Sequence, residues 1–152
     1  MNPDTEAIRL AYSAWVRHAT LAAIGLFALI AVEQLAVREQ FWGAPGGGEN
    51  LRYLVWAAAV AGVFVARTLK QRGPAPALDM IAAARALSWK LLALSIAPAF
   101  VGFLLSFLTR SALDFLAMLV VSLVAFALLF PSYALWLTWN APVMPDGDGD
   151  PL

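Results

Sequence analysis

Residues 91–109 read LLALSIAPAFVGFLLSFLT, contain no charged side chain and are closed by Arg110. A transmembrane helix needs roughly 20 predominantly apolar residues, so this segment predicts one membrane span. No charged residue occurs between Phe115 and Pro145 either, which predicts a second span close behind the first. The residues between them leave room only for a tight turn. Proline removes a helix hydrogen bond, so Pro131 is expected to kink or loosen the last turns of this later span.

Two earlier segments have shorter uncharged centres. Residues 19–32 lie between Arg17 and Glu33, and residues 53–66 lie between Arg52 and Arg67. Both reach membrane length if the flanking charged side chains extend to the interface. We therefore predict four spans, at about 15–37, 51–69, 90–109 and 113–137.

Composition supports a membrane protein of one domain, residues 1–152. Hydrophobic residues make up 62% of the chain and charged residues 13%, against about 45 to 50% and about 25% in a soluble domain. The predicted fold class is all-α: an integral membrane, antiparallel bundle of four transmembrane helices. No separate soluble domain is expected beside it.

The connections divide the chain in the same way. Residues 43–48 (GAPGGG) and 73–76 (GPAP) are helix breakers. Residues 79–90 predict an amphipathic helix, which is either interfacial or an extension of the third span. Residues 1–6 and 141–152 are expected to be mobile tails. The N-terminus does not resemble a cleaved signal peptide, so the first span is expected to remain in the mature protein.

The distribution of basic residues predicts the orientation. Short cytoplasmic loops are enriched in Lys and Arg. Three basic residues, Arg38, Arg52 and Arg110, fall on one side of the predicted bundle. The other seven fall on the side of the N-terminus and the second connection: Arg9, Arg17, Arg67, Lys70, Arg72, Arg85 and Lys90. We therefore expect both termini on the cytoplasmic side, in a bacterial cytoplasmic membrane.

Small residues indicate where the spans pack. Transmembrane helices associate through close packing of small side chains and through interhelical hydrogen bonds. The second span carries Ala58, Gly62 and Ala66 at intervals of four. The third span carries a similar stripe, namely Ser95, Ala99, Gly102 and Ser106. Both stripes are predicted helix contacts; the alternative is that alanine is simply frequent in this chain.

Five polar residues are candidates for contact with an ion or a lipid. Glu33 could bind a proton or cation inside the membrane, or could extend to the interface beside Arg38. His18 is the only histidine, so it lacks the further ligands that a haem or zinc site needs. It is expected at the inner headgroup level. Arg67, Lys70 and Arg72 could bind anionic lipid or an acidic partner, or could only fix the topology.

Other kinds of chemistry lack the residues that they need. The chain has no cysteine, no glycine-rich phosphate loop and no metalloprotease motif. Asp146, Asp148 and Asp150 resemble the start of a calcium loop, but the glutamate that closes such a loop is missing. We therefore predict no catalytic, cofactor-binding or metal site, and a net charge of zero gives no reason to expect a nucleic-acid partner.

Two resemblances bear on function. The stretch from Trp89 to Pro131 resembles small uncharacterised bacterial four-span membrane proteins whose third helix is similar to rotor-ring proteolipids, with an Ala-x-x-Gly step at Ala99 and Gly102. The proteolipids carry their ion on a carboxylate in mid-helix, where this span has only serines. In length and span number the chain also resembles the four-helix glutathione transferases of membranes. Glu49, Asn50 and Arg52 supply the residue types of their signature without its pattern.

The function expected from these features is that of a non-catalytic membrane subunit or scaffold in a larger protein complex. Its expected partners are membrane lipids and other membrane subunits or further copies of itself. The first alternative is a small transporter or a proton- or cation-conducting component that uses Glu33. The second is a membrane enzyme of the glutathione-transferase type.

Overall fold

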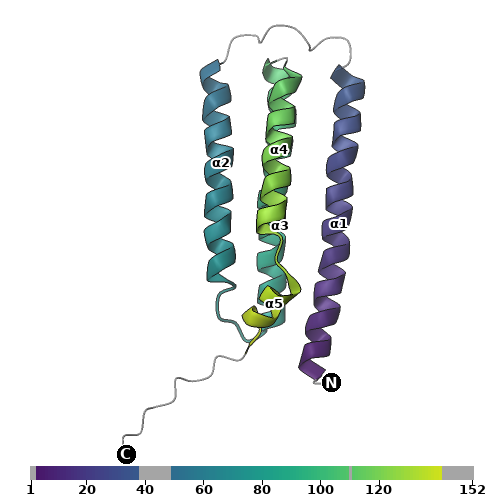
Figure 1. The fold of residues 1–152 in the computed structure, drawn as a ribbon, viewed down its shortest axis with the longest axis vertical. Helices are drawn as coiled ribbons and strands as arrows, with labels where there is room; N and C mark the ends of the chain where they lie inside the picture. The colour runs from purple at the N-terminus through teal and green to yellow at the C-terminus, as the bar shows by residue number, and fades with distance from the viewer. Residues whose placement is uncertain (1–2, 38–48, 110, 142–152) are drawn as a thin grey trace, which may run out of the picture.

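The computed structural model describes residues 3–37, 49–109 and 111–141 as five helices and no strand. These are α1 (Pro3–Val37), α2 (Glu49–Arg72), α3 (Met80–Thr109), α4 (Ala112–Leu129) and α5 (Tyr133–Trp139). The first four are long and apolar enough to cross a membrane, and they run antiparallel (Figure 1). The protein is therefore an all-α integral membrane protein, which confirms the predicted fold class.

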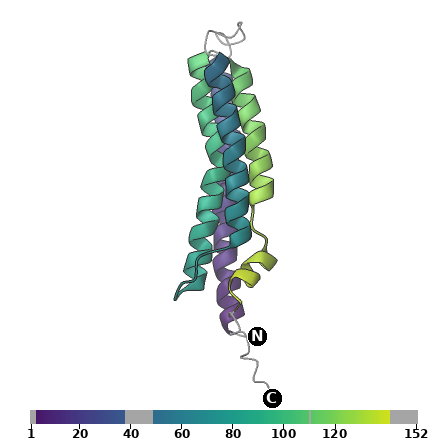
Figure 2. The ribbon, with the colours of Figure 1, turned by 90° about the vertical axis from the view of Figure 1, so that its left-hand side faces the viewer.

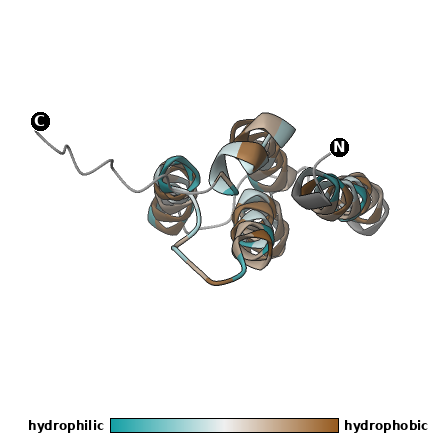
Figure 3. Cartoon of the chain, turned by 90° about the horizontal axis from the view of Figure 1, so that it is seen from below, coloured by the Kyte–Doolittle hydropathy of each residue, from teal (hydrophilic) through white to brown (hydrophobic). Residues whose placement is uncertain are grey.

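The helices are not arranged as a square bundle. α3 and α4 form a central hairpin, and α1 and α2 lie on opposite sides of it (Figures 1 and 3). Viewed from the side of α2, that helix lies in front of the hairpin with α3 and α4 on either side of it (Figure 2). α1 packs mainly on α3 and α5, whereas α2 packs on both α3 and α4. We call the end that carries Pro3 and α5 the inner end, and the opposite end the outer end.

Two helices extend beyond the expected spans. α1 has 35 residues and α3 has 30, which correspond to about 52 Å and about 45 Å, against a hydrocarbon core of about 30 Å. Residues 80–90 belong to α3 without a break, so the predicted amphipathic helix is an extension of the third span. Asp79 begins it, because its Oδ1 accepts a hydrogen bond from the backbone N–H of Ala82 at 2.9 Å.

The fourth predicted span is interrupted earlier than expected. α4 ends at Leu129, and α5 begins only at Tyr133. Pro131 has no N–H to donate, and Ser132 caps the new helix by accepting a hydrogen bond from Leu135 N at 3.2 Å. The chain therefore breaks at Pro131 where the sequence predicted only a loosened helix. Of the predicted mobile tail at 141–152, all but Ala141 lies outside the described residues, as does the predicted breaker at 43–48.

The hairpin is built on a seven-residue repeat. Buried small or polar residues recur along one face of α3, at Ser88, Ser95, Gly102 and Thr109. Such a repeat is typical of helices that pack nearly antiparallel with interlocking side chains. A Cβ added at Gly102 would overlap Met118 Cβ and would lie 3.2 Å from the backbone oxygen of Asp114. The absence of a side chain at Gly102 therefore permits the closest approach of the two helices.

A serine on α4 is bonded to α3 beside its internal proline. Ser122 Oγ accepts a hydrogen bond from Ala99 N at 2.7 Å and lies 3.4 Å from Ile96 O. Both partners flank Pro98, which is buried within α3. Pro98 has no N–H, so α3 lacks one of its own hydrogen bonds here, and contacts with a neighbouring helix commonly compensate for such a loss in a membrane. Ser122 thus links the two helices at the point where α3 is weakest.

Aromatic side chains fix α5 at the inner end. Trp136 is fully buried, and its Nε1 donates a hydrogen bond to Ser88 Oγ at 3.1 Å. The ring of Tyr12 on α1 lies 5.6 Å from that of Trp136 and 5.3 Å from that of Tyr133. Trp15 packs on Phe130 at 4.8 Å. Aromatic rings gather where a membrane meets water, so this cluster is consistent with an interface at the inner end.

Candidate functional site

A buried ion pair joins α2 to the hairpin at the outer end. Arg52 Nε lies 2.7 Å from Asp114 Oδ1, and the Asp114 side chain is almost completely buried. Thr109 Oγ1 donates a hydrogen bond to Asp114 Oδ2. Asp114 also lies in the first turn of α4, where the helix dipole favours a negative charge. This carboxylate is therefore compensated on several sides.

Glu33 lies near the same end of the molecule. It belongs to α1, four residues before that helix ends at Val37, and its exposed fraction is zero. The sequence left open whether its side chain extends to the interface or is enclosed within the protein. The structure encloses it. The neighbouring residues 38–48, which include Arg38, lie outside the described part of the chain.

The small residues of α3 lie in the seam of the hairpin. Ser95, Ala99, Gly102 and Ser106 are all buried. The serine hydroxyls donate to carbonyls of their own helix, Ser95 to Leu92 O and Ser106 to Phe103 O. Their polar groups are thus satisfied locally, and they contribute to the seam chiefly through their small size.

The small residues of α2 are placed differently. Ala66 is fully buried, but Ala58 is exposed and a Cβ added at Gly62 would meet no atom within 4 Å. Ala58 and Gly62 instead line a groove between α2 and α3, with a volume of about 360 Å³. We call it the α2–α3 groove; its other lining residues are Val55, Ala59, Leu94, Ala97, Pro98 and Val101. Within the chain, only one member of the predicted stripe forms a close helix contact.

The basic residues at the inner end of α2 have different environments. Lys70 Nζ donates to Leu128 O at 2.7 Å and to Phe130 O at 3.0 Å, so it caps the last turn of α4. Arg67 and Arg72 are exposed. Lys70 therefore has a structural role that the sequence did not reveal, because its acceptors are freed only by the chain break at Pro131.

His18 is exposed on α1. Its Nδ1 lies 2.7 Å from the backbone oxygen of Ala14, and its ring centroid is 5.6 Å from that of Trp89. Both contacts are typical of a histidine in an aromatic interface.

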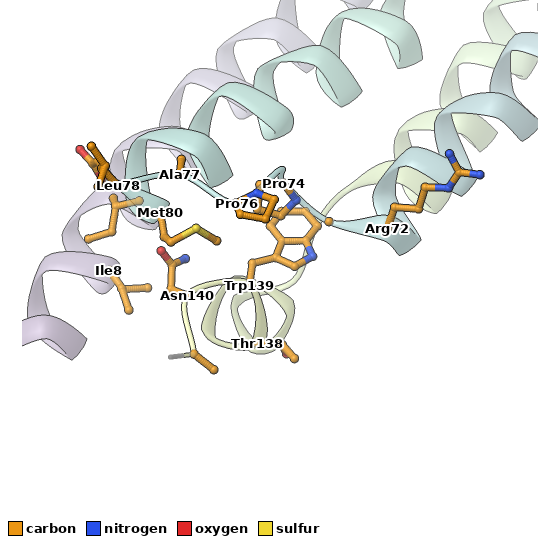
Figure 4. A pocket seen from close by; sticks show the side chains of 14 residues that line it. Ile8, Arg72, Pro74, Pro76, Ala77, Leu78, Met80, Thr138, Trp139 and Asn140 are labelled. Carbon is orange, nitrogen blue, oxygen red and sulfur yellow. The ribbon is translucent and has the colours of Figure 1, made fainter. Parts of the chain in front are cut away.

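A hollow lies at the inner end, between α5 and the link from α2 to α3 (Figure 4). It measures about 790 Å³. Trp139 packs beside Pro74 and Pro76, whereas Arg72 points away from them (Figure 4). Gly73 has φ +76° and would place a Cβ 3.1 Å from the Trp139 ring, so this turn requires glycine. Pro74, Pro76 and Trp139 therefore shape the hollow, and no group of charged side chains converges in it.

The described residues form no recognisable metal site. No three His, Cys, Asp or Glu side chains gather among them in a way that could bind a metal. No family model, curated protein or solved structure matches this chain. Of the residues that resemble the glutathione-transferase signature, Arg52 is engaged by Asp114 and Asn50 is exposed on the first turn of α2. Besides the hollow, open features of the described residues include the two faces of α2 and a groove of about 250 Å³ between α1 and α3, lined in part by Gly25 and Phe100.

Sequence reasoning missed two residues that position the helices. Asp114 marks only the edge of an apolar run in the sequence, and Ser122 is a single hydroxyl within that run. Each had a usable signal, because an ionisable or polar group inside a span is seldom left without a partner. The identity of each partner depends on how the helices are arranged, which no local pattern specifies.

Proposed function

We propose that this protein is a non-catalytic subunit or scaffold of a larger membrane protein complex. In this proposal a transmembrane helix of a neighbouring subunit packs into the α2–α3 groove. The observation that supports it is the open space at Gly62. Small residues in a membrane permit close contact between helices, and here they lie on a face that the chain itself does not cover.

A comparison of Gly62 with Gly102 supports this assignment. They are two of the three glycines in the described membrane helices; at the third, Gly25 of α1, an added Cβ would also meet no atom within 4 Å. The space beside Gly102 is filled by Met118 of the same chain, whereas Gly62 faces an open groove. Lipid tails can fill such a groove, but they gain little from the absence of a Cβ. A helix backbone gains close van der Waals contact from it. A partner helix is therefore the occupant that uses these residues most fully.

Photo-crosslinking tests this proposal directly. Ala97 lines the α2–α3 groove, whereas Ala93 is exposed one turn earlier on α3 and does not line it. A photoreactive residue at position 97, in cells, is expected to form an adduct with a transmembrane segment of another subunit. The same photoreactive residue at position 93 should form much less of this adduct. Equal adducts at both positions, or lipid adducts alone, would contradict the proposal.

A substitution provides a second test. Gly62→Leu should remove the partner from protein purified in a mild detergent, because the new side chain occupies the groove. Ala61→Leu is the matched control, since Ala61 is exposed on the same helix outside the groove. The lone subunit should remain folded in both variants. Retention of the partner by Gly62→Leu would argue against the groove as the interface.

The proposed orientation places both termini in the cytoplasm, in a bacterial cytoplasmic membrane. Seven basic residues lie on the helix segments near the inner end, which supports this assignment through the positive-inside rule. The chain has no cysteine, so single cysteines can report topology. Cysteines at position 47 and at position 75, an exposed alanine in the link from α2 to α3, should be labelled from opposite sides of the membrane, with position 75 accessible from the cytoplasm.

A proton- or cation-conducting component is the second candidate. The complete burial of Glu33 within a transmembrane helix favours it, because such carboxylates often line ion pathways. Glu33→Gln should then abolish proton or cation flux into proteoliposomes that contain the protein. Unchanged flux, or no flux in the unmodified protein, would eliminate this candidate.

A further inference from the structure

A second groove runs along α2, on the side that faces α4, and it has a positive charge at one end. Its volume is about 240 Å³, and Arg67 forms part of its lining. The apolar part of the lining includes Val60, Val63 and Phe64 from α2 and Val120, Val124 and Leu128 from α4. We call it the α2–α4 groove.

The charge lies at the inner end of this groove. Arg67 is five residues before the end of α2, and Lys70 follows it by one helical turn. Two of the three N–H groups of Lys70 are directed to Leu128 O and Phe130 O. The third is available to another acceptor, since an ammonium group donates three hydrogen bonds. Arg67 and Lys70 therefore place two positive charges at the inner end of the α2–α4 groove.

These cations lack an acidic counterpart in the described part of the chain. The ion pair found there joins Arg52 to Asp114, at the opposite end of α2. Arg67 is exposed and makes no hydrogen bond or ion pair with a described residue. A ligand with a negative headgroup would supply the missing charge.

We propose that the α2–α4 groove binds one anionic phospholipid. Its phosphate contacts the Arg67 guanidinium and the free N–H of Lys70, and one acyl chain lies along the valines of α2 and α4. Basic pockets between transmembrane helices on the cytoplasmic side are known binding sites for anionic headgroups.

The lining of this groove favours an acyl chain over a protein helix. Valine side chains line both walls, with Phe64 on α2 and Leu128 on α4, and the lining contains no glycine or alanine. A helix backbone could therefore not approach closely, whereas a narrow, flexible acyl chain can follow such walls. The α2–α3 groove has the opposite character, so the two faces of α2 suit different occupants.

Native mass spectrometry of the purified protein tests this inference. With phosphatidylglycerol and phosphatidylcholine of identical acyl chains, the protein should retain one phosphatidylglycerol in preference to phosphatidylcholine. Arg67→Gln should weaken phosphatidylglycerol binding about fivefold or more, as expected for the loss of one basic contact near the membrane surface. Arg85→Gln is the matched control, because Arg85 is an exposed arginine near the inner end of α3.

A second variant separates the groove from the charge. Val124→Trp leaves both cations in place but fills the groove, and Val124 is exposed enough to accept a larger side chain without disturbing the core. It should also weaken binding of the phospholipid, whereas added inorganic phosphate should not compete with it. Equal retention of phosphatidylcholine, equal effects of Arg67→Gln and Arg85→Gln, or unchanged binding by Val124→Trp would overturn the inference. Gly62 lies outside this groove, so a failure here is distinguishable from a failure of the proposed subunit interface.

Discussion

The α3–α4 hairpin and helix α2 are held in the molecule by different means. The two helices of the hairpin interlock in the middle of α4, with Gly102 against Met118 and Ser122 hydrogen-bonded to Ala99. α2 is bonded near its two ends, by Arg52 to Asp114 and by Lys70 to the last carbonyls of α4. Between these contacts it leaves a groove on each side.

This difference indicates how the protein divides two tasks. Close packing of small against large side chains gives the hairpin its shape, and the hydrogen bond from Ala99 N to Ser122 Oγ adds a polar link to it. The polar contacts of α2 set its position while its two faces stay accessible to other molecules. Under the proposals above, attachment of α2 near its ends leaves its faces free for a partner helix and a lipid.

The largest expected effect comes from breaking the outer attachment of α2. Arg52→Met leaves the buried Asp114 carboxylate without its cation, which should lower the free energy of unfolding by about 3 to 5 kcal/mol. Titration with a denaturing detergent measures the loss. The double variant Arg52→Met with Asp114→Asn should recover much of it, because no charge is then left unpaired and Thr109 keeps an acceptor. If the double variant were as unstable as the single one, the ion pair would not be the cause.

The second effect concerns the hairpin itself. Gly102→Ala introduces a Cβ that overlaps Met118, and overpacking of this kind costs about 1 to 3 kcal/mol. The same unfolding titration measures it. Met118→Ala in the Gly102→Ala background should restore part of the stability by removing the atoms that clash. Tolerance of Gly102→Ala would show that the hairpin is not closely packed at this point.

The difference between the α3–α4 hairpin and helix α2 could be predicted from the sequence only in part. The uncharged run at 91–109 and the short turn after it are sufficient to predict the hairpin, and the stripe that contains Gly102 lies on the face that packs. The stripe that contains Gly62 has the same spacing but faces a groove. Spacing shows that a helix can pack closely; it does not show whether the partner belongs to the same chain.

The polar attachments were harder to predict for a physical reason. Arg52 and Asp114 are distant in the sequence, and each appears as an ordinary charge at the edge of a span. Their pairing depends on α2 lying beside the start of α4 and not beside α1. Lys70 likewise gains its acceptors only because α4 ends at Leu129. Such contacts follow from the three-dimensional arrangement of the helices and not from local periodicity.

A smaller effect tests the hydrogen bond within the hairpin. Ser122→Ala removes the acceptor of the Ala99 N–H beside Pro98, and interhelical hydrogen bonds in membranes contribute about 0.6 to 1.7 kcal/mol. Ser106→Ala is the control, because this buried serine donates only to Phe103 O of its own helix. Unfolding titrations should show a larger loss for Ser122→Ala. Equal losses would indicate that Ser122 contributes through its size alone.

The smallest effect sharpens the comparison of the two glycines. Gly62→Ala places a methyl group in open space, so it should not destabilise the isolated subunit, and the better helix propensity of alanine could add up to about 1 kcal/mol. Gly102→Ala, the same change in the hairpin, is expected to have the opposite sign. The two variants measured side by side in detergent therefore report which glycine is covered by the chain itself. A loss for Gly62→Ala as large as that for Gly102→Ala would mean that the α2–α3 groove is closed in the folded protein, and the proposed interface would then have no site.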